Sequence, residues 1–236
     1  MKISFIIPAY NEEKYIADCI DSIIKYGPEE AEIIVIDNAS TDQTAQVAGQ
    51  YPRVKIVAEP DKGLTKARQK GLETAQGELL AYIDADNRIS EHWLKILEKE
   101  FSKNEELVCL SGRYHFYDGS KIKQVLLSPL FHFFVFFVEK LTSYLIYGGN
   151  FVAKKQALLN AGGFDKNIAF YGEDTEIAQR LSKVGKVKFR YDFFVYASAR
   201  RFHSEGVFKM IFKYSLNYIW IVIFKKPFTK EYKDIR

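Results

Sequence analysis

Short apolar segments alternate with amphipathic ones in the first part of the chain, and this order constrains the fold more than any other feature. The apolar segments, which predict buried strands, are 3–7, 32–36, 54–57 and 79–83. The segments between them have apolar residues at helical spacing and predict helices over 15–23, 42–49 and 64–75. Ser40 is the predicted N-cap of the middle helix. This alternation predicts an α/β fold with a mostly parallel central sheet and helices on both faces.

Polar clusters follow three of the four predicted strands, at the point where each strand ends. These clusters are residues 9–12, Asp37 with Asn38, and residues 84–87. In open sheets of this kind, ligands bind beyond the carboxyl ends of the strands. We therefore expect the three clusters to share one rim of the sheet and to form the functional site.

Asp84 and Asp86 are separated by one small residue at the end of a strongly apolar run. In an extended chain, side chains two residues apart point to the same side, so the two carboxylates would repel each other. A divalent cation with oxygen ligands would offset that repulsion. The alternative is a solvated acidic turn in which Asn87 assists the turn.

Several enzyme classes are disfavoured by motifs that the sequence lacks. No G-x-G-x-x-G follows the first strand and no G-x-x-x-x-G-K-[ST] occurs, which argues against dinucleotide oxidoreductases and P-loop enzymes.

The two cysteines, Cys19 and Cys109, form no metal-type pattern and favour a reducing compartment without disulfides. The chain opens on an apolar strand, so we predict no signal peptide. A length of 236 residues fits one domain, or one domain with an appendage.

The later part of the chain departs from this regular alternation. Residues 125–138 are almost wholly apolar, and residues 148–152 predict a flexible loop that enters a strand. Residues 161–163 predict a helix that ends at glycine. The acidic stretch 171–176 opens a predicted helix over 177–184.

Four stretches in order resemble the family 2 glycosyltransferases with the GT-A fold. They are SFIIPAYNEEKYI, IIVIDNASTDQT, DKGLTKARQKGLETAQGELLAYIDADN and GEDTEIAQRL. The resemblance runs from about residue 3 to residue 185 and is more specific than any one of the motifs. It implies inverting transfer of a sugar from a nucleoside-diphosphate sugar, UDP- or GDP-linked, with Mg²⁺ or Mn²⁺.

Position by position, the resemblance implies roles for residues on the donor side. Asp37 would read the edge of the base, Asp84 would face the ribose and the metal, and Asp86 would ligate the metal. The side chains of Lys62 and Arg68 would lie near the base and the diphosphate. The base and the ribose would be lined by Pro8, Ala9, Tyr10 and Glu12.

On the acceptor side, Asp174 matches the general base of the family. An attacking hydroxyl needs a carboxylate within hydrogen-bond reach to take its proton. We expect the N-terminus of the helix to keep Asp174 ionised; the alternative is that residues 172–174 only cap the helix. Gly149, Asn150 and Glu173 are expected to contact the acceptor or a phosphate.

Basic residues near position 200 are further candidates for the site. Arg200 and Arg201 could hold phosphates of the donor or the acceptor, and the alternative is a charged loop. Some GT-A enzymes use a late histidine as a further metal ligand, which makes His203 a candidate. The alternative for His203 is an ordinary surface residue.

Two departures from the family pattern bear on these expectations. Asp61-Lys62-Gly63 stands where the family usually has Asn-x-Gly, which leaves that contact open, and the Q-x-x-R-W signature of processive members is missing. We therefore expect a non-processive enzyme. A nucleotidyltransferase is an alternative, but it would have a glycine- and arginine-rich loop after the first strand. A non-catalytic nucleotide-sugar-binding or membrane module is another, which the intact Asp84, Asp86 and Asp174 disfavour.

Positive charge is concentrated at the C-terminal end. Residues 200–236 contain nine Lys and Arg against three acids, which leaves 25 bases against 27 acids in the rest. A basic tail suits nucleic acid or an anionic membrane. We expect the membrane, and no nucleic-acid partner, because the basic excess lies beside the apolar segment 218–224. Ahead of that segment, apolar residues recur at helical spacing over 207–214, with Lys209 and Lys213 on another face. Residues 125–138 would form a helix of about 21 Å, too short to span. The alternative for both segments is core or an oligomer interface.

These observations divide the chain into a glycosyltransferase domain and a tail. The GT-A domain is expected over 1–203, with a nucleotide-binding half at about 1–112 and an acceptor half at 113–203. A basic amphipathic helical tail is expected over 204–236. We expect a cytoplasmic protein bound peripherally to the inner face of the membrane, with a glycan or a lipid-linked acceptor such as a polyprenyl phosphate.

Overall fold

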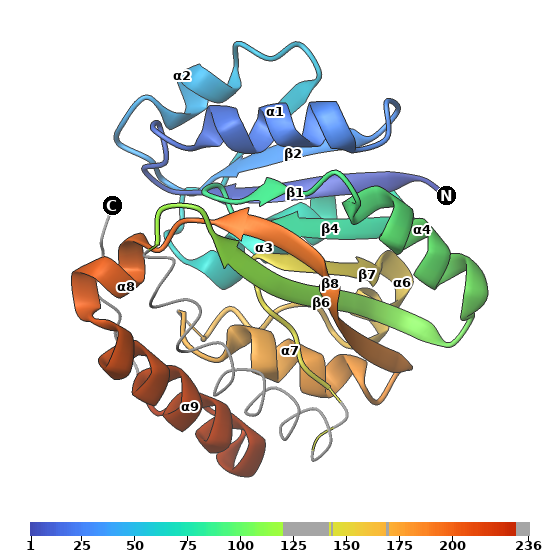
Figure 1. The fold of residues 1–236 in the computed structure, drawn as a ribbon, viewed down its shortest axis with the longest axis vertical. Helices are drawn as coiled ribbons and strands as arrows, with labels where there is room; N and C mark the ends of the chain where they lie inside the picture. Colours follow the sequence, from blue (N-terminus) through green and yellow to red (C-terminus); the bar gives the residue numbers. More distant parts are fainter. Residues whose placement is uncertain (120–141, 143, 169, 230–236) are drawn as a thin grey trace.

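The computed structural model describes residues 1–119, 142, 144–168 and 170–229. They contain one eight-stranded sheet with the strand order β3-β2-β1-β4-β7-β6-β8-β5 (Figure 1). The strands are β1 (Ile3–Ala9), β2 (Glu32–Asp37), β3 (Val54–Ala58), β4 (Leu79–Ile83), β5 (Arg88–Ile89), β6 (Leu107–Phe116), β7 (Asn150–Lys154) and β8 (Lys186–Ala197).

The four strands predicted from the first part of the chain are present as β1 to β4, and all of them pair in parallel. A further parallel pair joins β6 to β8. Strand β7 lies between β4 and β6 and is antiparallel to both, and β5 is antiparallel to β8. The sheet is therefore parallel in four of its seven pairings, and the run of parallel strands from β3 to β4 is interrupted by β7.

Helices cover both faces of the sheet, as the alternation predicts (Figure 1). Strand β1 shows how the two layers form, because Phe5 and Ile7 pack into one core while Ile6 packs into the other. The first core lies under α1 (Ile16–Tyr26), α2 (Thr44–Ala48) and α4 (Trp93–Lys103). The second core lies under α3 (Leu64–Thr74), α6 (Lys155–Asn160) and α7 (Glu173–Leu181).

The helix ends that we predicted from capping residues agree with the structure only in part. Ser40 does not cap α2, which begins at Thr44; its Oγ accepts a hydrogen bond from the Asn11 N–H instead. The helix predicted over 177–184 begins at Glu173, because Gly172 adopts a left-handed conformation immediately before it. The glycine-terminated helix is confirmed as α6, with Gly162 and Gly163 both at positive φ.

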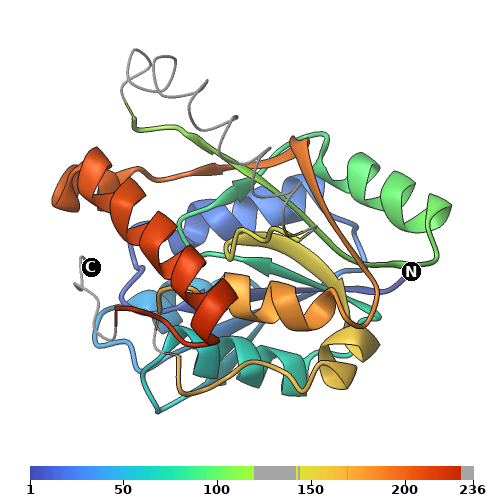
Figure 2. The ribbon, with the colours of Figure 1, turned by 90° about the horizontal axis from the view of Figure 1, so that it is seen from below.

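The C-terminal part forms α8 (Arg200–Glu205) and α9 (Val207–Phe224), and α9 lies beside α7 in both orientations (Figures 1 and 2). The expected boundaries after residues 112 and 203 fall inside β6 and α8, so neither coincides with a break between elements. The apolar segment 125–138 lies outside the described residues. Within the described ranges, no helix is both long and apolar enough to cross a membrane.

Candidate functional site

The loops that follow β1 and β2 are tied together at the carboxyl ends of those strands. The Glu12 N–H donates to Thr44 Oγ1 at 2.7 Å, and the Thr41 N–H donates to Asn11 Oδ1 at 2.8 Å. The Asp37 carboxylate accepts the Ser40 N–H at 3.2 Å. Two of the predicted polar clusters therefore meet at one rim of the sheet.

A hollow opens at this rim, between the end of β1 and the start of α3. Lys62 extends across it, with its Nζ 3.7 Å from the centre of the Tyr10 ring. The hollow is lined by Pro8, Ala9, Tyr10, Asn38, Lys62, Leu64, Ala67 and Phe170. Four of the sequence-predicted donor residues, Pro8, Ala9, Tyr10 and Lys62, are thus brought to one surface, whereas Asp37 and Glu12 lie beside it.

Asn38 shapes this hollow; the sequence placed it in a polar cluster at the rim but gave it no individual role. Its side chain donates to the carbonyls of Glu59 and Asp61 at 3.0 and 2.8 Å. Its Oδ1 accepts the Gly63 N–H at 2.7 Å. Asn38 therefore holds the loop that carries Lys62, and its position directly after a buried strand was the available signal.

Asp84 and Asp86 each face a guanidinium group, and the two groups come from distant parts of the chain. Arg68 Nη2 lies 3.4 Å from Asp84 Oδ1, and Arg200 Nη2 lies 3.1 Å from Asp86 Oδ2. Arg200 also binds the buried Glu12 carboxylate and stacks over the Tyr15 ring. The positive charge that the aspartate pair requires is thus supplied by two arginines in this structure.

The aspartate pair has the chemistry of a site for Mg²⁺ or Mn²⁺. The Asp84 side chain is 37% exposed, so its carboxylate can reach a ligand in the rim. Magnesium is commonly held by one or two carboxylates together with substrate phosphates, and a full protein cage is not needed. Within the part of the chain that the structure describes, no three His, Cys, Asp or Glu side chains form a metal cluster. His203 is exposed on α8.

Gly149 and Asn150 lie next to the aspartate pair but play different parts. A Cβ on Gly149 would lie 2.3 Å from Asp84 Oδ2, so only glycine allows this close approach. Asn150 is fully buried, and its amide binds the Trp93 indole and the Phe193 carbonyl. The expected contact of Asn150 with an acceptor is therefore wrong, because its side chain is directed into the core and its polar atoms are used there.

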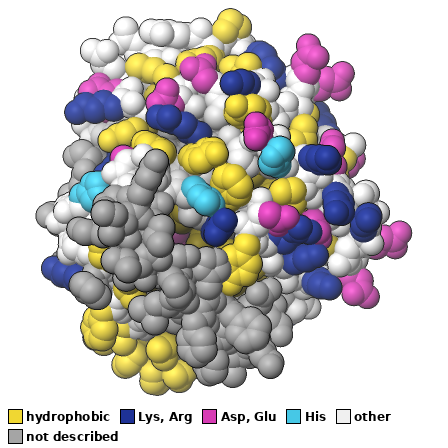
Figure 3. Space-filling model, viewed as in Figure 1, with side chains coloured by type: hydrophobic (Ala, Val, Ile, Leu, Met, Phe, Trp, Pro, Cys, Tyr) yellow, Lys and Arg dark blue, Asp and Glu magenta, His cyan; other side chains and the backbone are white. Residues whose placement is uncertain are grey.

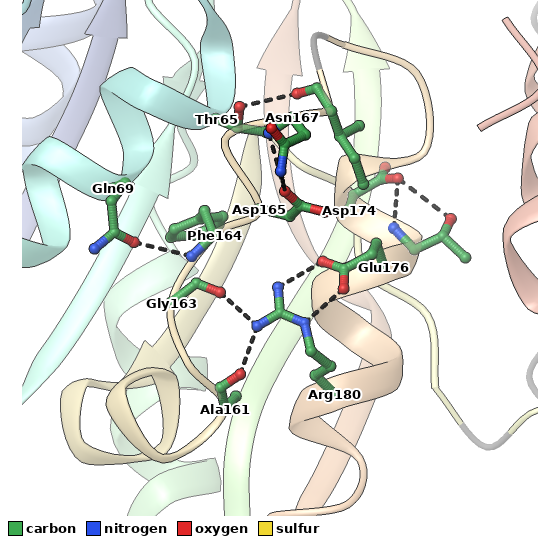
Figure 4. Close-up of polar contacts among 12 residues, drawn as sticks. Thr65, Gln69, Ala161, Gly163, Phe164, Asp165, Asn167, Asp174, Glu176 and Arg180 are labelled. Atoms are coloured by element: carbon green, nitrogen blue, oxygen red, sulfur yellow. Dashed lines mark hydrogen bonds and ion pairs between the residues drawn. The ribbon is translucent and has the colours of Figure 1, made fainter. Parts of the chain in front are cut away.

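The N-terminus of α7 carries Glu173 and Asp174, as the acidic stretch predicts. Asp174 Oδ1 accepts the N–H of Thr175 at 2.7 Å and its hydroxyl at 3.3 Å (Figure 4). The N-cap position is Gly172, so Asp174 belongs to the first turn. We expected the helix end to keep Asp174 ionised. Burial raises its pKa and opposes this, whereas Arg68 and the Thr175 N–H lower its pKa.

A clamp between α3 and α7 holds the loop that precedes Asp174. Arg180 binds the Glu176 carboxylate with two nitrogens and donates to the carbonyls of Ala161 and Gly163 (Figure 4). Gln69 Oε1 accepts the Phe164 N–H at 2.9 Å from the other side. Sequence reasoning missed this clamp, for which the four-residue spacing of Glu176 and Arg180 was the available signal.

Arg201 connects α8 to the hollow. Its guanidinium lies over the Phe170 ring at 4.5 Å, and Phe170 is one of the lining residues. Arg201 also pairs with Glu205 at 3.4 Å. The predicted phosphate-binding residues Arg200 and Arg201 are therefore both at the rim, one beside Asp86 and the other beside the hollow.

Comparison with solved structures identifies this arrangement as the GT-A fold. The mannosyltransferase PcManGT from Pyrobaculum calidifontis, in complex with GDP-Man and Mn²⁺, superposes with a TM-score of 0.69 at 20% identity, over 86% of this chain and 59% of that chain. The Staphylococcus aureus TarS fragment 1-349, in complex with UDP-GlcNAc, superposes with a TM-score of 0.67 at 22% identity, over 85% and 59%. The predicted fold class is confirmed.

The sequence places the chain in a family. The profile of glycosyl transferase family 2 matches residues 4–160, and the chain belongs to this family. The chondroitin synthase of Pasteurella multocida (strain Pm70) is 30% identical over 192 residues, which is 79% of this chain and 19% of that protein. The chain thus spans about a fifth of the length of that relative.

Proposed function

We propose that the protein is an inverting, non-processive glycosyltransferase that moves a sugar from a nucleoside-diphosphate sugar to a hydroxyl or phosphate acceptor. The observation that carries this proposal is that Asp84 and Glu173, the neighbour of Asp174, contact the same guanidinium of Arg68. Inversion requires a base and a leaving group on opposite sides of one sugar ring. Both groups must therefore lie within reach of one bound sugar. A donor-side and an acceptor-side carboxylate that contact the same guanidinium are close enough for this.

On the donor side, we propose that the hollow lined by Pro8, Ala9, Tyr10 and Lys62 receives the nucleotide, with Asp37 at the edge of the base. Arg200 and Arg201 would hold the diphosphate. Of the two structural neighbours above, one is in complex with GDP-Man and the other with UDP-GlcNAc, so both bases are candidates.

Asp84 and Asp86 would hold Mg²⁺ or Mn²⁺, and a bound metal would stabilise the negative charge on the departing diphosphate. On the acceptor side, Asp174 would take the proton of the attacking hydroxyl. A carboxylate with a raised pKa is a stronger base than an ordinary aspartate, so the burial of Asp174 suits this role.

Thermal-shift measurements with UDP- and GDP-sugars and Mn²⁺ would identify the donor, because a bound ligand stabilises the folded chain in proportion to RT ln(1+[L]/Kd). The donor found is then incubated with candidate acceptors. Release of the nucleoside diphosphate is the expected result. Release of pyrophosphate would indicate a nucleotidyltransferase, and a stabilising donor that is never cleaved would indicate a binding module.

We also propose that α9 binds an anionic membrane surface and that the acceptor is lipid-linked. The face of α9 that packs on the protein carries Met210, Asn217 and Ile221. Phe212, Ile219 and Ile223 each follow one of these residues by two positions, so they point to the opposite face of the helix. Their side chains are 67%, 52% and 60% exposed.

Hydrophobic side chains gather on the molecule where α9 lies (Figure 3). The exposed Lys209 near the start of the helix and Lys225 and Lys226 at its end add positive charge. An exposed apolar face with flanking lysines is typical of helices that lie in the headgroup plane. The cytoplasmic leaflet, which is anionic, is therefore the proposed location.

The double variant Phe212→Ser/Ile223→Ser should sediment several-fold less with anionic liposomes than the wild type, because it removes two of the most exposed apolar side chains of α9. Leu159→Ser/Val184→Ser, at exposed apolar positions outside α9, is the matched control and should sediment like the wild type. Raised salt should weaken sedimentation of the intact protein. A wild-type protein that ignores anionic liposomes at low salt would rule out the membrane proposal.

A further inference from the structure

Arg68 is a buried cation at the centre of the candidate site. Its side chain is 1% exposed, although its neighbour Ala67 on α3 lines the hollow. Nη1 lies 3.0 Å from Glu173 Oε1, and Nη2 lies 3.4 Å from Asp84 Oδ1. One guanidinium therefore joins the end of β4 to the first turn of α7.

The surroundings of Arg68 enclose its guanidinium on further sides. A Cβ on Gly148 would lie 2.7 Å from Nη2, so the backbone passes directly against the group. The Phe151 ring centre lies 5.9 Å from Cζ. A side chain enclosed in this way is poorly placed to contact a diphosphate, which is the role that the family resemblance implies for it.

We propose that Arg68 is a positioning residue that fixes the first turn of α7 against the aspartate pair and supplies the positive charge that Asp174 needs to act as a base. This inference rests on the proposed role of Asp174 as the general base. Arg68 itself would touch neither donor nor acceptor.

The electrostatic part follows from the burial of two adjacent acids. Burial raises the pKa of both Glu173 and Asp174, and the charge of Asp174 raises that of Glu173 further. Arg68 lowers the pKa of both carboxyls and is the largest influence that favours the ionised form of Asp174. Without Arg68, Asp174 would hold its proton to a higher pH and would be a poorer base below that pH.

Apart from Arg68 and Glu173, the groups of the described residues whose pKa responds to Asp174 include four tyrosines, which do not replace this charge. Tyr114 comes from β6, Tyr147 from the segment before β7, and Tyr214 and Tyr218 from α9. Burial raises the pKa of each of these phenols, so all four are neutral around pH 7. Arg68 is therefore the group whose removal should change the titration of Asp174.

Arg68→Met tests the charge while keeping much of the length of the side chain. The acid limb of the kcat/KM pH profile should move to higher pH by about one unit, which is about a tenfold loss on that limb. Activity should recover as the pH rises, and donor affinity measured by thermal shift should stay within a few-fold. A folded variant with an unmoved acid limb would overturn the charge role, and selective loss of donor binding would assign Arg68 to the donor site.

Arg68→Lys tests whether Arg68 must contact Asp84 and Glu173 at the same time. It also keeps the proposal testable if Arg68→Met does not fold. A lysine is a single point charge and reaches only one of the two acids well. The acid limb should stay near its wild-type position while kcat falls about tenfold. A folded lysine variant with wild-type kcat would overturn the positioning role. A wild type that is itself inactive with every donor would instead contradict the proposed function, and the base role with it.

Discussion

Asp86→Ala is expected to abolish sugar transfer and to remove Mn²⁺-dependent donor binding, while the protein remains folded. Asp86 lies on the rim and pairs with Arg200, which keeps Glu12 as a partner when Asp86 is lost. No uncompensated buried charge is therefore created. The measurements are turnover with Mn²⁺, and the thermal shift caused by the donor with and without Mn²⁺.

Asp192→Ala is a matched control for this experiment. Arg190 joins Asp192 and Glu100 in the way that Arg200 joins Asp86 and Glu12, but this cluster is formed by α4 and β8. Loss of the Asp192 carboxylate should leave turnover and its dependence on Mn²⁺ unchanged. Undiminished Mn²⁺-dependent turnover in Asp86→Ala would show that Asp86 is not a metal ligand.

Asp174→Asn is expected to lower kcat by roughly 10²–10⁴ while donor affinity stays within a few-fold. The amide keeps the size of the side chain, and its oxygen can still accept the Thr175 N–H, but it cannot take a proton. Single-turnover rates and donor titrations separate the two quantities. A loss of donor binding as severe as the loss of kcat would assign Asp174 to the nucleotide site.

Glu176→Gln, two residues further along the same turn, is the control for Asp174→Asn. Glu176 pairs with Arg180 and lies in the loop clamp (Figure 4). Its amide keeps one acceptor oxygen for Arg180, so kcat should stay within a few-fold of the wild type. A collapse of kcat in this variant would mean that the order of the clamp, and not the proton chemistry of Asp174, limits the rate.

The parallel part of the fold and its rim could be predicted from local patterns. Each of β1, β2 and β4 is a short apolar run followed by a polar cluster, and these signals are contained within a few positions. The pairing of β6, β7 and β8 gave no such signal, since nothing local tells an antiparallel insertion from another parallel strand.

The side-chain partners in the site could not be predicted, because they are distant in sequence. Arg68 and Glu173 are 105 residues apart, and Arg200 and Glu12 are 188 apart. The residue types indicated a charged site, but only the fold decides which acid meets which arginine. Asn150 was misassigned for a related reason, because its position after two glycines suggested a loop residue while its side chain is directed into the core.

The most direct test of the central claim is an assay of nucleoside-diphosphate release by the wild type and by Asp174→Asn. Both proteins are incubated with Mn²⁺, the donor that stabilises the wild type most, and a lipid-linked acceptor. We expect acceptor-dependent release of UDP or GDP by the wild type, and release slower by two orders of magnitude or more in the variant. Equal release by the two proteins, or release of pyrophosphate in place of a nucleoside diphosphate, would contradict the account.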